Sequence, residues 1–188
     1  MKSLITIAAA ILVSFAAYAQ SNAPEMILVE GGTFSMGNDE SQFEDEYPEH
    51  DVTLASFYIS KYEITIDLYR RFGAVTGKRI PEGPDNFPAY GISWEDAVMF
   101  SNWLSNINGL ERCYEISRDG KHFRAKFNPD ANGFRLPTEA EWEFAAQGGN
   151  KTRYNSYSGG EDPKEIAWYL HSGNEIKPVG KKEPNELG

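Results

Sequence analysis

The chain has 188 residues, of which 40% are hydrophobic and 13% aromatic, so it can bury a sizeable core and is not a disordered segment. Its formal net charge of −10 disfavours nucleic acid as a partner. The single cysteine, Cys113, excludes an internal disulfide or a redox pair within the chain.

Residues 1–19 have the layout of a secretory signal peptide. Lys2 precedes an apolar run from Leu4 to Ala17, and Ala17-Tyr18-Ala19 forms a small-residue cleavage pattern before Gln20. The run is too short to predict a membrane span, and no later stretch approaches the roughly 18 consecutive apolar residues that a span needs. We therefore expect export to the periplasm or the medium, and a mature chain from Gln20 without a membrane span.

Short strands are predicted next. Met26 to Val29 is apolar and Thr33 to Gly37 alternates, which indicates two strands around a turn at Gly31-Gly32. Val52 to Tyr62 resumes an alternating, aromatic-rich pattern and is interpreted as one strand. Residues 39–51 hold seven acidic residues and no Lys or Arg, which predicts a solvated loop. A cation site is the alternative, although the spacing is not that of an EF-hand.

Two helices follow these strands. The first is predicted from Thr65 to Thr76 and is ended by Gly77. Its apolar face consists of Leu68, Phe72 and Val75. The second begins at the N-cap Ser93 and ends at Asn108-Gly109. Its apolar face consists of Trp94, Ala97, Val98, Ser101 and Leu104.

A third helix carries the strongest local signal. Thr138 as N-cap and Glu141 three residues later form a capping box, and Gly148-Gly149 closes the segment. Before it, Tyr114 to Phe127 indicates a hairpin, because Asp119-Gly120 is a pair that type I′ turns prefer. Beyond Gly148 the composition predicts mostly loop around short strands. The whole pattern is typical of an α+β fold with short strands, about three helices and much irregular structure.

Local motifs give no catalytic or metal-binding residue. The phosphate-binding loop, the dinucleotide fingerprint, the nucleophile elbow and the H-E-x-x-H zinc motif are all missing from the sequence. The three histidines lie far apart and are expected as surface residues: His50, His122 and His171. Cys113 is expected to be a small buried residue, with a reactive thiol as the alternative.

The tryptophans divide into two groups. Trp94 and Trp142 lie near predicted helix starts beside apolar neighbours, so we expect them in the core. Trp168 and Tyr169 lie in the loop-rich part and are the candidate binding residues, because exposed aromatic side chains suit a carbohydrate or peptide groove.

Several strings resemble, in order, those of the formylglycine-generating enzyme family, also called sulfatase-modifying factors. They are VEGGTFSMG at 29–37, EYPEHDV at 46–52, YEIT at 62–65, GISWEDA at 91–97, GFRLPTEAEWEFAA at 133–146, and PVG, PN and LG between 178 and 188. The string at 133–146 is the most specific, and the resemblance spans residues 26–188. Within that string we expect Arg135 to form an ion pair with Glu139 or Glu141.

The resemblance implies a variant of the C-type lectin fold with little regular structure. Enzymes of the family oxidise a sulfatase cysteine to Cα-formylglycine, using molecular oxygen and a copper ion held by two cysteine thiolates. Thiolates are soft ligands that suit Cu(I). The resemblance also implies calcium in a full-length protein, and a sulfatase-like protein or peptide as partner if the protein is active.

The sequence departs from the family at the residues that carry this chemistry. The family's two cysteines lie downstream of a G-N-V-W-E-W string that the chain does not contain, and Cys113 matches neither of them. A calcium-ligand Asn position of the family is occupied here by Ile166. We therefore expect residues 20–188 to be a formylglycine-generating-enzyme-like domain cut off before the catalytic segment, with no cofactor on this chain. The alternative is a non-catalytic exported binding or structural module of the same fold.

Overall fold

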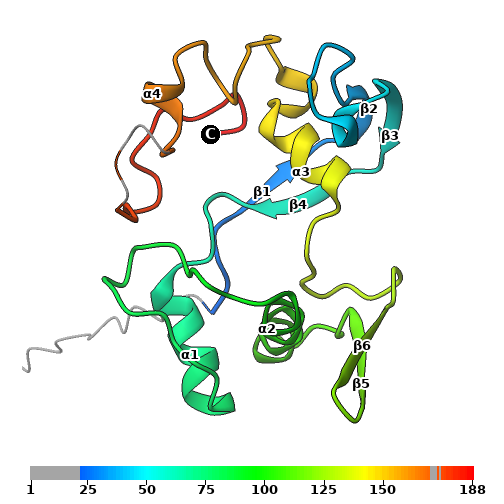
Figure 1. The fold of residues 1–188 in the computed structure, drawn as a ribbon. Helices are drawn as coiled ribbons and strands as arrows, with labels where there is room; N and C mark the ends of the chain where they lie inside the picture. Colours follow the sequence, from blue (N-terminus) through cyan, green and yellow to red (C-terminus); the bar gives the residue numbers. More distant parts are fainter. Residues whose placement is uncertain (1–21, 170–172, 174) are drawn as a thin grey trace, which may run out of the picture.

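The computed structural model describes residues 22–169, 173 and 175–188 (Figure 1). The predicted signal peptide and His171 lie outside these residues. The described part is an α+β fold with short strands, as predicted. No helix in the described ranges is long and apolar enough to cross a bilayer.

A kinked antiparallel ribbon forms the N-terminal part of the fold. Its strands are β1 Met26–Val29, β2 Gly32–Met36, β3 His50–Leu54 and β4 Phe57–Ser60. β1 pairs with β4 and β2 pairs with β3. The register continues unshifted between the two ladders, because Val29 lies opposite Phe57 and Gly32 opposite Leu54. The first two predicted strands therefore exist but pair with later strands rather than with each other.

The kink explains why the prediction of one strand from Val52 to Tyr62 is wrong. The extended segment is interrupted at Ala55-Ser56, between β3 and β4, and the ribbon bends there. Gly31 lies opposite this break, its N–H donates to Ser56 Oγ at 3.0 Å, and a Cβ on Gly31 would lie 2.5 Å from the Leu54 carbonyl oxygen. The bend thus needs glycine at position 31.

The loop at 37–49 joins β2 to β3 and contains the one-turn 3-10 helix η1, Glu44–Glu46. Asn38 N–H donates to the Glu46 carbonyl at 2.7 Å, and Glu49 N–H donates to Asp39 Oδ1 at 2.7 Å. Apart from the undescribed Asp45, its acidic side chains are exposed. The structure therefore shows the solvated acidic loop that the sequence predicts.

Two helices, α1 Ile66–Thr76 and α2 Trp94–Ile107, form where the sequence predicts them. They pack on each other, which the sequence did not predict. Thr65 and Ser93 cap them through side-chain oxygens, and Gly77 ends α1 with φ 71°. Two expectations are wrong. Val75 is 70% exposed and Trp94 is 56% exposed, since the partner surface covers only the centre of each apolar face.

The predicted hairpin consists of β5 Tyr114–Asp119 and β6 His122–Phe127. Asp119 pairs with His122, so the two turn residues are Gly120 and Lys121. Gly120 has φ 59°, whereas Lys121 is not among the residues with positive φ. The turn is therefore of the type II′ pattern, with glycine first, and the predicted type I′ turn is wrong.

The rest of the chain contains α3 Glu139–Ala146, the 3-10 turn η2 Gly149–Lys151 and the short helix α4 Pro163–Ile166. α4 was not predicted, because four residues carry no periodic signal. The described residues after 148 contain one isolated bridge, Tyr157 with Gly160, in place of the expected short strands.

Two separate cores divide the fold into halves. The first lies between the ribbon and α3 and consists of Val29, Phe34, Phe57, Phe144 and Ala145. The second lies between α1 and α2 and consists of Leu68, Tyr69, Phe72, Phe100 and Leu104. Figure 1 shows the ribbon, α3 and α4 in one half, and α1, α2 and the β5–β6 hairpin in the other.

Candidate functional site

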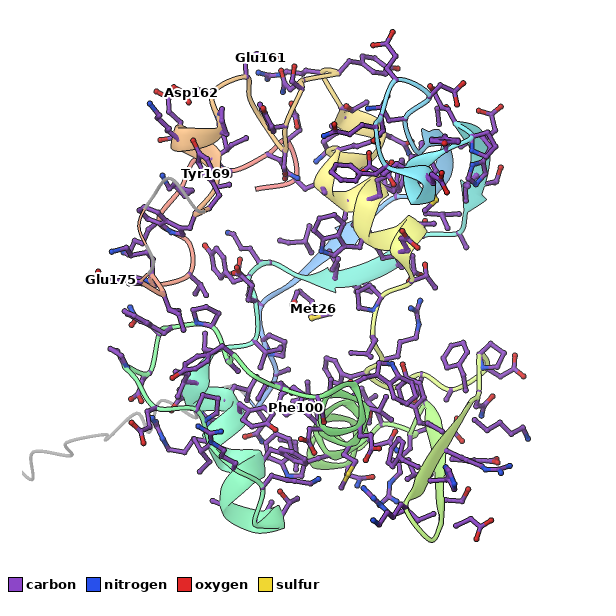
Figure 2. All side chains as sticks on the ribbon, in the orientation of Figure 1. Met26, Phe100, Glu161, Asp162, Tyr169 and Glu175 are labelled. Carbon is purple, nitrogen blue, oxygen red and sulfur yellow. The ribbon has the colours of Figure 1, made fainter. Side chains whose placement is uncertain are left out.

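A hollow of about 1970 Å³, open to solvent, lies between the two halves. Figure 2 shows Met26 at its β1 side and Phe100 at its α2 side. Its aromatic lining includes Phe57, Tyr58, Tyr62, Trp142, Trp168 and Tyr169. We call this space the central hollow.

One wall of the central hollow is the segment Gly133–Pro137, which joins the two halves. Phe134 N–H donates to Ser105 Oγ of α2 at 2.8 Å, and Leu136 N–H donates to the Tyr114 hydroxyl at 3.1 Å. A Cβ on Gly133 would lie 2.5 Å from Ser105 Oγ, so this close approach requires glycine. The wall is thereby fixed to the α1–α2 half.

The upper end of this wall is fixed by the ion pair that the sequence predicts. Arg135 donates to both carboxylate oxygens of Glu141, at 2.5 and 2.6 Å, and Thr138 N–H donates to the same carboxylate at 2.8 Å. Burial alone would raise the pKa of Glu141, but the hydrogen bonds from Arg135 and Thr138 outweigh it and hold that pKa below its ordinary value. The pair therefore joins this wall to the first turn of α3.

A second wall is the C-terminal segment 178–185, whose contacts were not predicted from the sequence. Val179 N–H donates to the Asn86 carbonyl at 3.1 Å in one half. In the half that contains the ribbon, Asn185 Nδ2 donates to the carbonyls of Ala145 and Ala146 at the end of α3, at 2.8 and 3.2 Å. The PN string at 184–185 was the available signal, since asparagine can cap helix carbonyls.

The predicted binding residues Trp168 and Tyr169 both line the central hollow. Trp168 is 45% exposed, and the Lys182 ammonium lies 3.9 Å from its ring centroid. Tyr169 is half-buried. Their role in binding stays a prediction.

The core placement expected for Trp142 is wrong, as it is for Trp94. Trp142 is 61% exposed and lines the central hollow, while its neighbour Phe144 faces the ribbon core. On α3 the apolar residues therefore divide between the core and the hollow. Periodicity alone does not distinguish these two destinations.

The central hollow differs from the rest of the surface in charge. Its lining contains five basic residues, Lys61, Arg135, Lys177, Lys181 and Lys182. It contains four acidic residues, Glu63, Glu141, Glu175 and Glu183. The lining is thus close to neutral in a chain whose formal net charge is −10. Such a surface suits an apolar or weakly charged occupant.

The residues of this chain do not fit the copper site that the family resemblance implies. That site needs two thiolates, whereas the chain has one cysteine. Cys113 is 1% exposed, its Sγ lies 3.8 Å from the Ala131 carbonyl oxygen, and burial raises the pKa of its thiol. The small buried residue that the sequence predicts is confirmed. In the described part of the chain, no three His, Cys, Asp or Glu side chains gather as a metal-binding group.

This chain is similar in sequence and in fold to known proteins. A profile of the sulfatase-modifying factor enzyme 1-like domain matches residues 14–188. The chain is 33% identical to the chaperone protein LppX of Paenibacillus barcinonensis, over 87% of this chain and 66% of LppX. It is 25% identical to the formylglycine-generating enzyme of Thermomonospora curvata, over 88% of this chain and 58% of that enzyme. Treponema denticola variable protein 1 superposes with a TM-score of 0.71 at 28% identity, over 87% of this chain and 67% of that protein.

This chain thus spans 66% or less of the length of these two curated relatives. The order of the resembling strings, the α+β architecture and the profile match over nearly the whole chain agree. The likeness to solved structures extends through both halves. By these findings the chain belongs to the sulfatase-modifying factor enzyme 1-like family, with its lectin-like fold.

Proposed function

We propose that this chain is a polypeptide-binding module of its family, with the central hollow as the binding face. The observation that carries the proposal is the near-neutral, aromatic lining of a hollow as large as 1970 Å³ between two small cores. Exposed apolar surface of this kind is uncommon on a protein that binds nothing. The name of LppX, a chaperone protein, supports a polypeptide as the partner.

Titration with an unfolded chain tests the proposal. The probe is fluorescein-labelled α-lactalbumin, reduced and carboxymethylated so that it cannot refold, and the readout is fluorescence anisotropy. We expect saturable binding that changes by less than about threefold between 0.05 and 0.5 M salt, since an apolar contact is screened little. Absence of binding, or its disappearance at high salt, would contradict the proposal.

A second candidate function is the generation of formylglycine, the activity printed in the name of the T. curvata relative, by oxidation of a substrate cysteine. Family membership favours it, and a sulfatase-like protein would then be the partner. The chain's own buried thiol does not supply the pair of thiolates. We therefore propose that oxidation, where it occurs, depends on a segment not contained in these 188 residues.

An aldehyde assay separates the two candidates. The chain is incubated with copper, oxygen and a cysteine peptide of sulfatase sequence, and aldehyde is detected by hydrazide labelling. The binding-module proposal expects no aldehyde above the level of a Cys113→Ala control. Aldehyde that depends on Cys113 would mean that this chain is an oxidase.

Export remains part of the proposal, because it rests on residues 1–19 alone. We propose a periplasmic or secreted mature protein that begins at Gln20. N-terminal sequencing of the protein recovered from the periplasm or medium should give Gln-Ser-Asn. Recovery in the cytoplasm with Met1 retained would contradict export.

A further inference from the structure

The turn and second strand of the β5–β6 hairpin form a basic segment on an acidic chain. Residues 121–127 contain three basic residues, Lys121, Arg124 and Lys126, and no acidic residue, whereas the chain has a formal net charge of −10. Lys121 and Arg124 have no ion-pair partner within the described part of the chain. Lys126 lies 3.6 Å from Glu115, but these side chains are 81% and 74% exposed, so the pair is weak. An anionic partner can therefore bind all three basic groups.

The basic side chains lie on the face of the hairpin that points away from the fold. Arg124 and Lys126 alternate with Phe123 along β6, so they lie on the opposite face from it. The Phe123 face contacts α2, because the rings of Phe123 and Trp94 lie 5.9 Å apart. Every residue on the Arg124 face is exposed. None of residues 114–127 lines the central hollow, so this face is a separate surface.

The loop between β2 and β3 carries the opposite charge. Residues 39–51 hold seven acidic residues and no Lys or Arg. The side chains of Glu44 and Glu46 are exposed and have no hydrogen-bond or ion-pair partner among the described residues. Phe43 and Tyr47, on either side of them, are 56% and 47% exposed. The loop therefore presents both acidic and aromatic side chains that the fold leaves uncovered.

The two segments match in pattern as well as in charge. Residues 43–47 read FEDEY and residues 123–127 read FRAKF, so each has an aromatic residue at both ends and charges of one sign between them. Figure 1 shows the β2–β3 pair and the β5–β6 hairpin at opposite ends of the molecule. One chain therefore cannot pair its own two segments, whereas two copies can.

We propose that the β5–β6 hairpin binds the β2–β3 loop of a second copy of this chain, an association beyond the polypeptide binding proposed above. Charge complementarity supplies the argument for this occupant. Arg124 and Lys126 of one copy pair with Glu44 and Glu46 of the next, and the flanking aromatic side chains pack beside them. A dimer formed in this way still has one free loop and one free hairpin. The association is therefore head to tail and continues into longer chains.

Sedimentation velocity of the full chain tests this inference. In about 0.1 M salt, the mean mass should rise with protein concentration between about 5 and 500 μM, the range of weak contacts. In about 0.5 M salt, the association constant should fall about tenfold or more, because exposed ion pairs are screened. A mean mass that stays that of one chain at every concentration would overturn the proposal.

Two neutralised variants identify the surfaces. Arg124→Ala with Lys126→Ala removes the basic side chains of the hairpin, and Glu44→Gln with Glu46→Gln removes the charges from the loop. Each double variant should associate with itself about tenfold or more weakly than the wild type. An equal mixture of the two should form dimers and nothing larger, because one variant keeps its loop and the other keeps its hairpin. A mixture that stays monomeric would show that the two segments do not bind each other.

A matched control separates the hairpin from the net charge. Arg79 and Lys151 are exposed and lie outside both segments, and Arg79→Ala with Lys151→Ala changes the net charge as much as the hairpin variant does. This control should associate like the wild type. If it associates as weakly as the hairpin variant, or if both neutralised variants associate like the wild type, the proposed contact is wrong. All of these variants should bind unfolded α-lactalbumin like the wild type, since none of the substituted residues lines the central hollow.

Discussion

Glu141 connects three parts of the structure through one carboxylate. It accepts from the Thr138 N–H to complete the cap of α3 and from Arg135 on the wall of the central hollow. Its own N–H is bound by Thr138 Oγ1 at 3.1 Å. Because the side chain is nearly buried, each of these donors would be left without its partner if the carboxylate were lost.

The stability lost on replacement of this carboxylate should depend on pH in a defined way. Glu141→Gln should lower the free energy of unfolding at pH 7 by about 2–4 kcal/mol, as expected for one half of a largely buried ion pair. The folded-state pKa lies below the ordinary value of 4.5. The stabilisation is therefore full above that value and is lost as pH falls through the folded pKa.

Urea unfolding from pH 7 to pH 2.5 measures this difference. Glu139→Gln is the control, because Glu139 is exposed in the same turn of α3. The control should stay within about 0.5 kcal/mol of the wild type. A Glu141→Gln deficit that stays constant down to pH 2.5 would show that the charge of Glu141 is not responsible.

The buried position of Cys113 predicts an unreactive thiol. Its raised pKa keeps it neutral at pH 7, and its Sγ is covered. A thiol reagent such as DTNB should react about a hundredfold more slowly with the native protein than with the protein in urea. Reaction at equal rates would mean that Cys113 is accessible in the folded protein.

At the scale of single elements, helix ends are the features that the sequence predicts best. Their signals are local, because a capping side chain bonds within three residues. Ser93 and Thr138 cap as predicted, and Thr65, predicted as the first residue of its helix, is the N-cap of α1. Strand pairing is not local, so the β1–β4 and β2–β3 pairs and the break at Ala55-Ser56 could not be derived from the alternating pattern. The pattern marks which residues are extended but not which strand lies beside them.

The prediction that Trp94 and Trp142 lie in the core was wrong for a related reason. A helical apolar face is predicted from spacing, but Trp94 and Trp142 lie in the first turns of α2 and α3. Whether a residue at a helix start meets the core or an open surface depends on packing between elements distant in sequence. The central hollow, formed from segments between Pro24 and Gly188, could not be predicted for the same reason.

The cap of α3 can be tested by itself. Thr138→Ala should lower the free energy of unfolding by about 1 kcal/mol, the usual value of an N-cap. Thr138→Ser should restore most of the loss, because serine keeps the oxygen that accepts from Glu141 N–H. Equal losses in both variants would assign the effect to the threonine methyl group and not to the cap.

At the scale of the whole molecule, two small cores flank a space that neither core fills. The described part contains thirteen buried hydrophobic residues and sixteen large hydrophobic residues that are exposed. Several of the exposed ones line the central hollow, including Tyr58, Trp142 and Trp168. This arrangement fits a domain that completes its packing when a polypeptide enters the hollow.

The affinity of two tryptophan variants for the unfolded α-lactalbumin probe tests the central claim most directly. Trp142 lines the hollow and Trp94, similarly exposed, does not. Trp142→Ala should weaken binding about tenfold, the effect of a central aromatic contact, with a change of less than about 1 kcal/mol in unfolding free energy. Trp94→Ala should leave binding unchanged. Equal affinities for both variants and the wild type would contradict the account.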